Sequence, residues 1–122
     1  MKVLLVEVNE RPTVAEIRSD LRSLRAILCR NGGHIEVVYP FEDNVGIICN
    51  EEGKIRGLPL NRALRNENGD VYDVICGNFI IAGLTEDDFG DLTDEQIEKY
   101  TQMFYRKELF IRKGQRLVSF TV

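Results

Sequence analysis

The spacing of apolar residues changes along the first third of the chain. Lys2 to Val8 is an almost continuous run of Val and Leu, which favours a strand buried on both faces rather than a signal peptide. Beyond Pro12, apolar residues recur at intervals of three and four, at Val14, Ile17, Leu21, Leu24 and Leu28. This spacing predicts an amphipathic helix over about 13–30, which the glycines of Asn31 to Gly33 end.

The next segments predict further strands. His34 to Tyr39 has strand character, so the opening third reads as a strand-helix-strand unit whose crossover is right-handed if the strands are parallel. Val45 to Asn50 predicts a buried strand, and the turn residues Glu51 to Lys54 then predict a hairpin that returns at Ile55. One helical turn is expected after Leu58, because Pro59 suits a first helical position.

The second half of the chain alternates apolar runs with turn residues. Val71 to Cys76 and Phe79 to Ala82 are separated by Gly77 and Asn78, which fits either two adjacent strands or one strand with a glycine bulge. Leu109 to Ile111 and Leu117 to Val122 predict a C-terminal hairpin.

A capping box marks a second helix, because Thr93 is followed three residues later by Gln96. Apolar residues then keep helical spacing, which predicts a helix over 93–104. Together these elements predict an α+β fold over a single domain, 1–122. It would have one mixed sheet of five to seven strands, two principal helices and the C-terminal hairpin.

Composition excludes several classes of protein. The 122 residues are 43% hydrophobic and 30% charged, with 3 Pro and 10 Gly, so the chain is neither disordered nor of low complexity. Its formal net charge of -4 argues against a general binder of duplex DNA or of membrane surfaces. The three cysteines are far apart and lie in apolar runs, which predicts buried, reduced thiols in a cytoplasmic protein.

Few residues are suited to catalysis. His34 is the only histidine, and no CxxC pair, nucleophile elbow or glycine-rich phosphate loop occurs. We therefore expect no metal, no cofactor and no enzymatic activity. Metal-dependent processing of RNA is the weaker alternative.

A loop rich in amide and cationic side chains is the first candidate binding site. Its glycines would let the backbone approach a partner, and its donors could hold a phosphate or carboxylate. The candidate residues are Asn50, Lys54, Arg56, Asn61 and Arg62. The alternative is a structural turn in which Leu58, Leu60 and Leu64 seal the core and the cations are solvated.

An acidic segment is the second candidate, because Thr85 to Glu98 contains no cation. Its acids are Glu86, Asp87, Asp88, Asp91, Asp94, Glu95 and Glu98. The helix dipole accounts for Asp94 and Glu95. The others form either an ordinary solvated face or a surface that imitates a phosphate backbone and occupies a basic channel of another protein.

Four segments resemble one known family, the domain of unknown function 3846, which occurs in phages, plasmids and integrative elements of Firmicutes. These segments are Met1 to Glu7, Ile35 to Phe41, Asn50 to Leu64 and Leu92 to Tyr100, and Gly57 to Leu64 is the most specific part. No catalytic residues are carried over from the family. The resemblance implies an accessory protein of a mobile element, acting in the cytoplasm of its bacterial host.

Two functions follow as hypotheses. The first is an anti-defence inhibitor, in its sharpest form an anti-CRISPR protein. It would bind a host protein such as the RNA-guided nuclease of a type II CRISPR system through the acidic face and block guide or target loading. The second is a module that binds or sequesters a nucleotide or second messenger through the 50–62 loop. The oligomeric state is left open.

Overall fold

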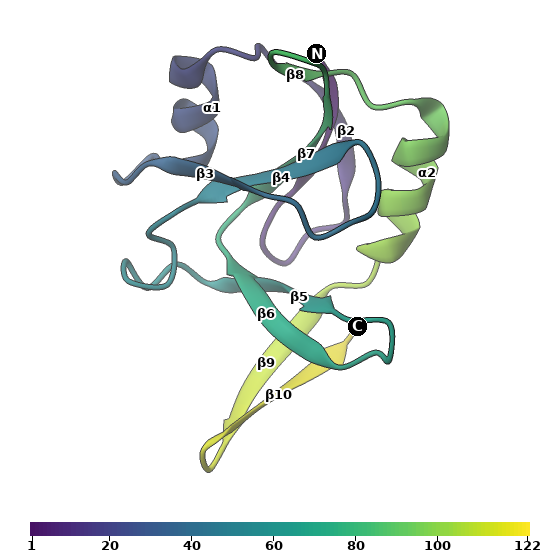
Figure 1. Cartoon of the computed structure of the whole chain (residues 1–122). Helices are drawn as coiled ribbons and strands as arrows, with labels where there is room; N and C mark the ends of the chain where they lie inside the picture. Colours follow the sequence, from purple (N-terminus) through teal and green to yellow (C-terminus); the bar gives the residue numbers. More distant parts are fainter.

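Antiparallel strands form the main sheet of the computed structural model, which describes residues 1–122 (Figure 1). Its strand order is β2-β1-β7-β4-β3, and the short β8 pairs with β7. The strands are β1 (Lys2–Val6), β2 (Thr13–Glu16), β3 (Ile35–Val38), β4 (Val45–Asn50), β7 (Phe79–Leu84) and β8 (Phe89–Gly90). Every pairing is antiparallel, so the prediction of a mixed sheet was wrong. The right-handed crossover, which was expected only for parallel strands in the opening third, is therefore also absent.

Successive residues of the central strands point to opposite faces of this sheet, as the period of two requires. Ile47 and Ile81 belong to one core cluster, with Tyr100 and Phe104 from the α2 side. Ile48 and Ile80 belong to the other, with Leu24 and Leu28 of α1. The helices α1 (Leu21–Leu28) and α2 (Asp94–Met103) therefore cover opposite faces (Figure 1).

The helix predicted over 13–30 is wrong in its first half. Residues 13–16 form β2, which pairs with β1 in a register that places Val3 opposite Ala15. The helix α1 begins only after Asp20, whose side chain accepts a hydrogen bond from the Ser23 amide at 2.9 Å. Pairing with β2 provides hydrogen-bond partners for the backbone groups at the free edge of β1, and the β-branched residues Thr13 and Val14 favour a strand. Tertiary context therefore overrides the helical spacing.

A second, two-stranded sheet consists of β5 (Leu60–Arg65) and β6 (Val71–Cys76). The helical turn expected after Leu58 is therefore wrong, because the chain enters β5. The hairpin expected between Val45 and Ile55 is also wrong, since β4 pairs with β3 and β7 while 51–57 form successive turns. Gly77, with φ +82°, turns the chain from β6 into β7, so the two strands belong to different sheets.

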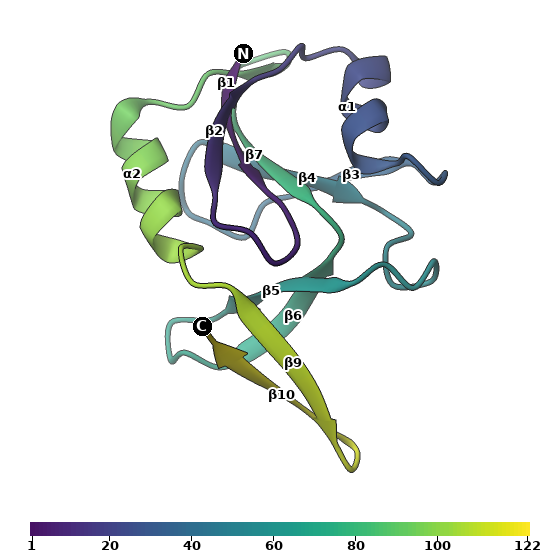
Figure 2. The ribbon, with the colours of Figure 1, turned by 180° about the vertical axis from the view of Figure 1, so that it is seen from behind.

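The last elements agree with the sequence. Thr93 caps α2 in a capping box with Gln96, and the strands β9 (Glu108–Lys113) and β10 (Arg116–Thr121) form the C-terminal hairpin. This hairpin projects from the body of the protein beside β5 and β6 (Figure 2). The α+β class is confirmed, although ten strands in three sheets replace the five to seven expected in one. Neither helix is long and apolar enough to cross a membrane.

Candidate functional site

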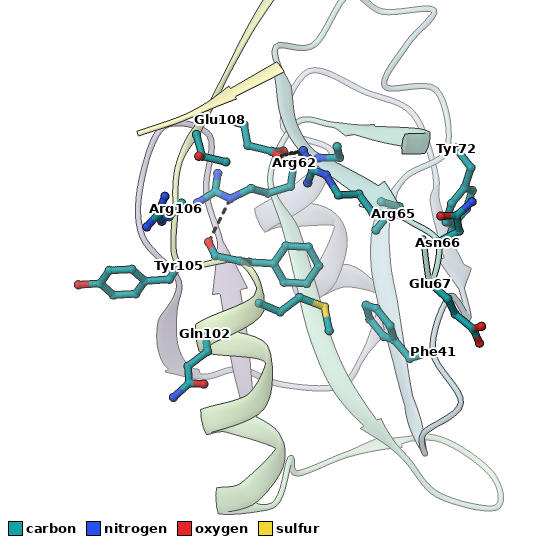
Figure 3. Close-up of a pocket in the computed structure, with 15 residues that line it drawn as sticks. Phe41, Arg62, Arg65, Asn66, Glu67, Tyr72, Gln102, Tyr105, Arg106 and Glu108 are labelled. Atoms are coloured by element: carbon teal, nitrogen blue, oxygen red, sulfur yellow. Dashed lines mark hydrogen bonds and ion pairs between the residues drawn. The ribbon is translucent and has the colours of Figure 1, made fainter. Parts of the chain in front are cut away.

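A cavity of about 610 Å³ lies where β5, the end of α2 and the C-terminal hairpin meet (Figure 3). We call it the hairpin cavity. Apolar side chains line much of it, among them Phe41, Leu64, Met103 and Phe104. The rings of Phe41 and Phe104 are 6.3 Å apart and meet edge to face, so this wall is held by aromatic packing.

Arg62 provides the most buried polar group of the cavity wall, since only 1% of the residue is exposed. Its Nε donates to the Phe104 carbonyl at 3.1 Å, and its Nη2 donates to the Glu10 carbonyl at 2.5 Å. Its Nη1 donates to Oδ1 of Asn61 at 2.8 Å. Burial lowers the pKa of Arg62, and the nearby Glu108 carboxylate opposes that shift. Arg62 thus joins β5 to two distant segments of the chain, around Glu10 and Phe104.

Glu108 is the buried carboxylate beside it. Oε2 accepts the amide of Ala63 at 2.5 Å, and Oε1 lies 2.7 Å from Nη2 of Arg65 as an ion pair without a hydrogen bond. Nη2 of Arg65 also donates to Oγ of Ser119 at 3.1 Å. These contacts attach both strands of the hairpin to β5. Figure 3 shows Arg62 and Arg65 close to Glu108, while the Tyr105 and Arg106 side chains point outward.

Sequence reasoning missed Glu108 and Arg65. The hairpin was expected to begin at Leu109, and Arg65 lies far from Glu108 in the chain. The only sequence signal for a role of Glu108 is that this acid precedes an apolar run in a tail rich in cations. That pattern does not show which cation the acid meets.

The five residues of the predicted loop site do not converge. Asn50 and Asn61 are buried with Arg62, and their amide groups bind backbone carbonyls, those of Gly32 and Gly77 among them, at 3.1 and 2.9 Å. Lys54 pairs with Asp73, and Arg56 pairs with Glu52 at 3.1 Å. Asn50 and Arg56 do share a small cavity of about 280 Å³ with Arg30. The ligand-binding loop stays a prediction, with Lys54 and Arg56 as its exposed cations.

The acidic segment is exposed at all seven predicted acids. It covers the turn between β7 and β8, the approach to α2 and the start of that helix. Lys2 engages two of the acids, since its amide donates to Asp91 at 2.7 Å and its ammonium group pairs with Asp94 at 3.1 Å. Only Asp94 has an ion-pair partner; the acids without one are Glu86, Asp87, Asp88, Asp91, Glu95 and Glu98.

The side chains with the most reactive chemistry are dispersed. No group of three or more His, Cys, Asp or Glu side chains is arranged to hold a metal ion. The three cysteines are free and buried, as predicted, and burial together with the Glu36 carboxylate raises the pKa of Cys49 to about 12. A thiol with that pKa is almost wholly protonated at neutral pH and is a poor nucleophile. His34 lies exposed at the entry to β3.

The model of one protein family, the domain of unknown function DUF3846, matches residues 1–105. The chain belongs to this family. No curated protein and no solved structure matches the chain. The DUF3846 match ends at Tyr105, so the hairpin β9–β10, with Glu108, lies beyond the matched residues. The hairpin cavity is therefore lined both by residues within the DUF3846 match and by residues after it.

Proposed function

We propose that this protein is a non-enzymatic binding module that receives an apolar group of its ligand in the hairpin cavity. The observation that carries the proposal is the cavity itself, which has about 610 Å³ of space between apolar walls. Ligand sites of proteins commonly have this size and combine apolar walls with a few convergent polar groups. Here Arg65, with part of its side chain exposed, and the rim residues Asn66 and Gln102 supply those groups.

Amide chemical shifts in ¹H–¹⁵N spectra test this proposal. The probes are capped single amino acids, such as N-acetylphenylalanine methylamide and its leucine analogue, and a panel of mononucleotides and cyclic dinucleotides. We expect the capped apolar compounds to shift amides of 62–66 and 102–108. Nucleotide-induced shifts confined to 51–57 would instead support the loop hypothesis. The cavity proposal is wrong if no probe shifts the amides around the cavity.

A matched pair of variants locates the site. Met103 lies on the cavity wall and is 49% exposed, whereas Leu21 is 59% exposed on the first turn of α1, away from the cavity. Met103→Arg places a charge at the cavity and should abolish the shifts. Leu21→Arg adds the same charge to the other helix and should leave them unchanged.

A second candidate function, inhibition of a host defence protein, is supported by the acidic segment. Of its seven exposed acids, the six without an ion-pair partner form a negative surface on a chain of net charge -4. Such a surface is complementary to a basic nucleic-acid channel, and complementary fields speed encounter. This inhibitor would act inside the bacterial host, where an RNA-guided nuclease of a type II CRISPR system is the sharpest target.

Target-DNA cleavage by such a nuclease tests the second candidate. The protein should inhibit cleavage at near-stoichiometric dose, and the double variant Asp87→Lys with Asp88→Lys should lose this inhibition. The double variant Glu42→Lys with Asp70→Lys changes the net charge equally at other exposed positions and should still inhibit. Equal loss in both variants would show that net charge, not this surface, is responsible.

A further inference from the structure

The inward face of the C-terminal hairpin borders open space along its length. Opposed residues of the two strands share this face, in the pairs Glu108 with Thr121, Phe110 with Ser119, and Arg112 with Leu117. The first pair lines the hairpin cavity. The other two pairs line a second cavity of about 540 Å³ between the hairpin and β6. Tyr72 of β6 lines both cavities, so they are neighbours, and we call the two together the hairpin trough.

This space is unusual for two layers of strands. Stacked sheets normally interlock their side chains, and protein interiors are packed like organic crystals. In the trough, Val71, Tyr72 and Leu117 remain large exposed hydrophobic residues although they line a space between two hairpins. Exposed apolar surface that is gathered into a depression commonly marks a binding site. The trough is therefore suited to an occupant that this chain does not supply.

The length of the trough favours an extended occupant. The inward face runs over six residues of each strand, and a strand rises about 3.3 Å per residue, so it spans about 17 Å. A compact ligand that fills only the hairpin cavity would leave the second cavity open. An extended chain of about five residues has the required length, and its alternate side chains point to the same side.

The charges of the trough favour an acidic peptide. Its lining has five cations and three acids, on a chain whose net charge is -4. Two of the cations are already paired, Lys54 with Asp73 and Arg65 with Glu108. Arg106 and Arg112 have no ion-pair partner and lie at opposite ends, one before β9 and one near the hairpin tip. A nucleic-acid strand would need free cations along its whole length and several stacking rings.

We infer that the hairpin trough binds an extended, acidic and apolar peptide segment of a partner protein. A large apolar side chain enters each cavity, while acidic side chains meet Arg112 near the hairpin tip and Arg106 at the outer edge of the hairpin cavity, where its side chain points outward. This inference rests on the proposed function, because the hairpin cavity is one of the two cavities. It adds the class of ligand, and it extends the binding site along the C-terminal hairpin, which follows the matched residues 1–105.

Selection from a random peptide library displayed on phage, with the whole protein as bait, tests the inference. We expect the selected sequences to alternate large apolar with acidic residues. Their affinity is then measured by fluorescence anisotropy on the wild type and on two variants of the hairpin. Leu117 lines the trough and is 45% exposed, whereas Ile111 is 53% exposed on the opposite face of the same hairpin.

Leu117→Arg should weaken binding of the selected peptides by at least about tenfold, as expected for loss of a central apolar contact. Ile111→Arg should leave it within about twofold. Binding of N-acetylphenylalanine methylamide, which occupies only the hairpin cavity, should be unchanged in both variants. Circular dichroism spectra confirm that each variant is folded.

The outcomes separate the two proposals. If the capped amino acid binds but no library peptide does, or if Leu117→Arg leaves peptide affinity unchanged, the peptide inference is wrong and the cavity proposal stands. If neither probe binds, both are wrong. If single-stranded RNA binds and Leu117→Arg weakens it, the trough is a nucleic-acid site and the peptide inference is overturned.

Discussion

At the scale of single residues, two polar groups of the predicted loop have a structural role. Asn61 and Arg62 are almost fully buried, and they bind carbonyls of Val6, Glu10, Gly77 and Phe104. Buried polar groups must find such partners, since an unpaired one costs about 1 to 3 kcal/mol. These two side chains consequently join the end of β1, the corner after β6 and the end of α2.

The variant Arg62→Met should lower the free energy of unfolding by about 3 kcal/mol, because several buried carbonyls lose their donor together. Arg56→Met is the matched control, since Arg56 comes from the same predicted loop but forms a partly exposed ion pair with Glu52. Its cost should stay below about 1 kcal/mol. Urea denaturation measures both, and equal costs would contradict the structural role of Arg62.

The hydrogen bond between Tyr100 and Asp43 should make stability depend on pH. Oη of Tyr100 donates to Oδ2 of Asp43 at 2.7 Å, which lowers the pKa of Asp43 from its ordinary 3.8. Burial, together with this hydrogen bond, raises the pKa of Tyr100. Because the pKa of Asp43 is lower in the folded than in the unfolded protein, the carboxylate stabilises the fold at pH values above its unfolded-state pKa. This contribution is lost as the pH falls through the folded-state pKa.

Tyr100→Phe should therefore cost about 1 to 2 kcal/mol near pH 7. The difference from the wild type should shrink below about pH 4, near the ordinary pKa of an aspartate. Urea denaturation over a series of pH values measures it. Tyr39→Phe, which removes the hydroxyl of an exposed tyrosine, should have no comparable effect. A difference for Tyr100→Phe that is constant down to pH 2 would assign the loss to packing alone.

At the scale of elements, local signals decided some boundaries and tertiary pairing decided others. The capping box at Thr93 predicted the start of α2 correctly, because its two hydrogen bonds lie within one turn of chain. The helical spacing from Val14 onward was misleading. Residues 13–16 complete the edge of β1, and no residue near them in sequence reveals that partner.

Thr93→Ala should lower the free energy of unfolding by about 1 kcal/mol, because the amide of Gln96 loses its acceptor at the helix start. Thr93→Ser keeps a hydroxyl at the cap and should cost much less. Thermal denaturation compares the two. If both variants cost the same, the methyl group and not the cap is the stabilising feature.

At the scale of the whole molecule, a domain with a buried central sheet carries its C-terminal hairpin at one corner. The strands β4 and β7 lie in the middle of that sheet, and nearly all of their residues are buried. The strands β9 and β10 pair only with one another, and most of their residues are exposed or half-buried. Opening of the hairpin therefore need not disrupt the main sheet.

Hydrogen exchange should show this difference in stability. Amides of β4 and β7 should exchange most slowly, near the rate set by global unfolding, whereas those of β9 and β10 should exchange at least about a hundredfold faster through local opening. Peptides selected for the trough should slow exchange in the hairpin without changing β4. Equal protection of the hairpin and the central sheet would show that they unfold as one unit.

The sequence by itself determined what depends on neighbouring residues. It determined the buried runs of β1, β4 and β7, the cap of α2, the turn of the closing hairpin and the family, since burial patterns and caps extend over only a few positions. Tertiary structure decided the strand order, the conversion of residues 13–16 into β2 and the inward direction of Arg62. It also decided the meeting of Arg65 with Glu108, and thereby the cavity. Those features depend on hydrogen bonds and ion pairs between segments far apart in the chain, and a pattern of polar and apolar residues does not specify such partners.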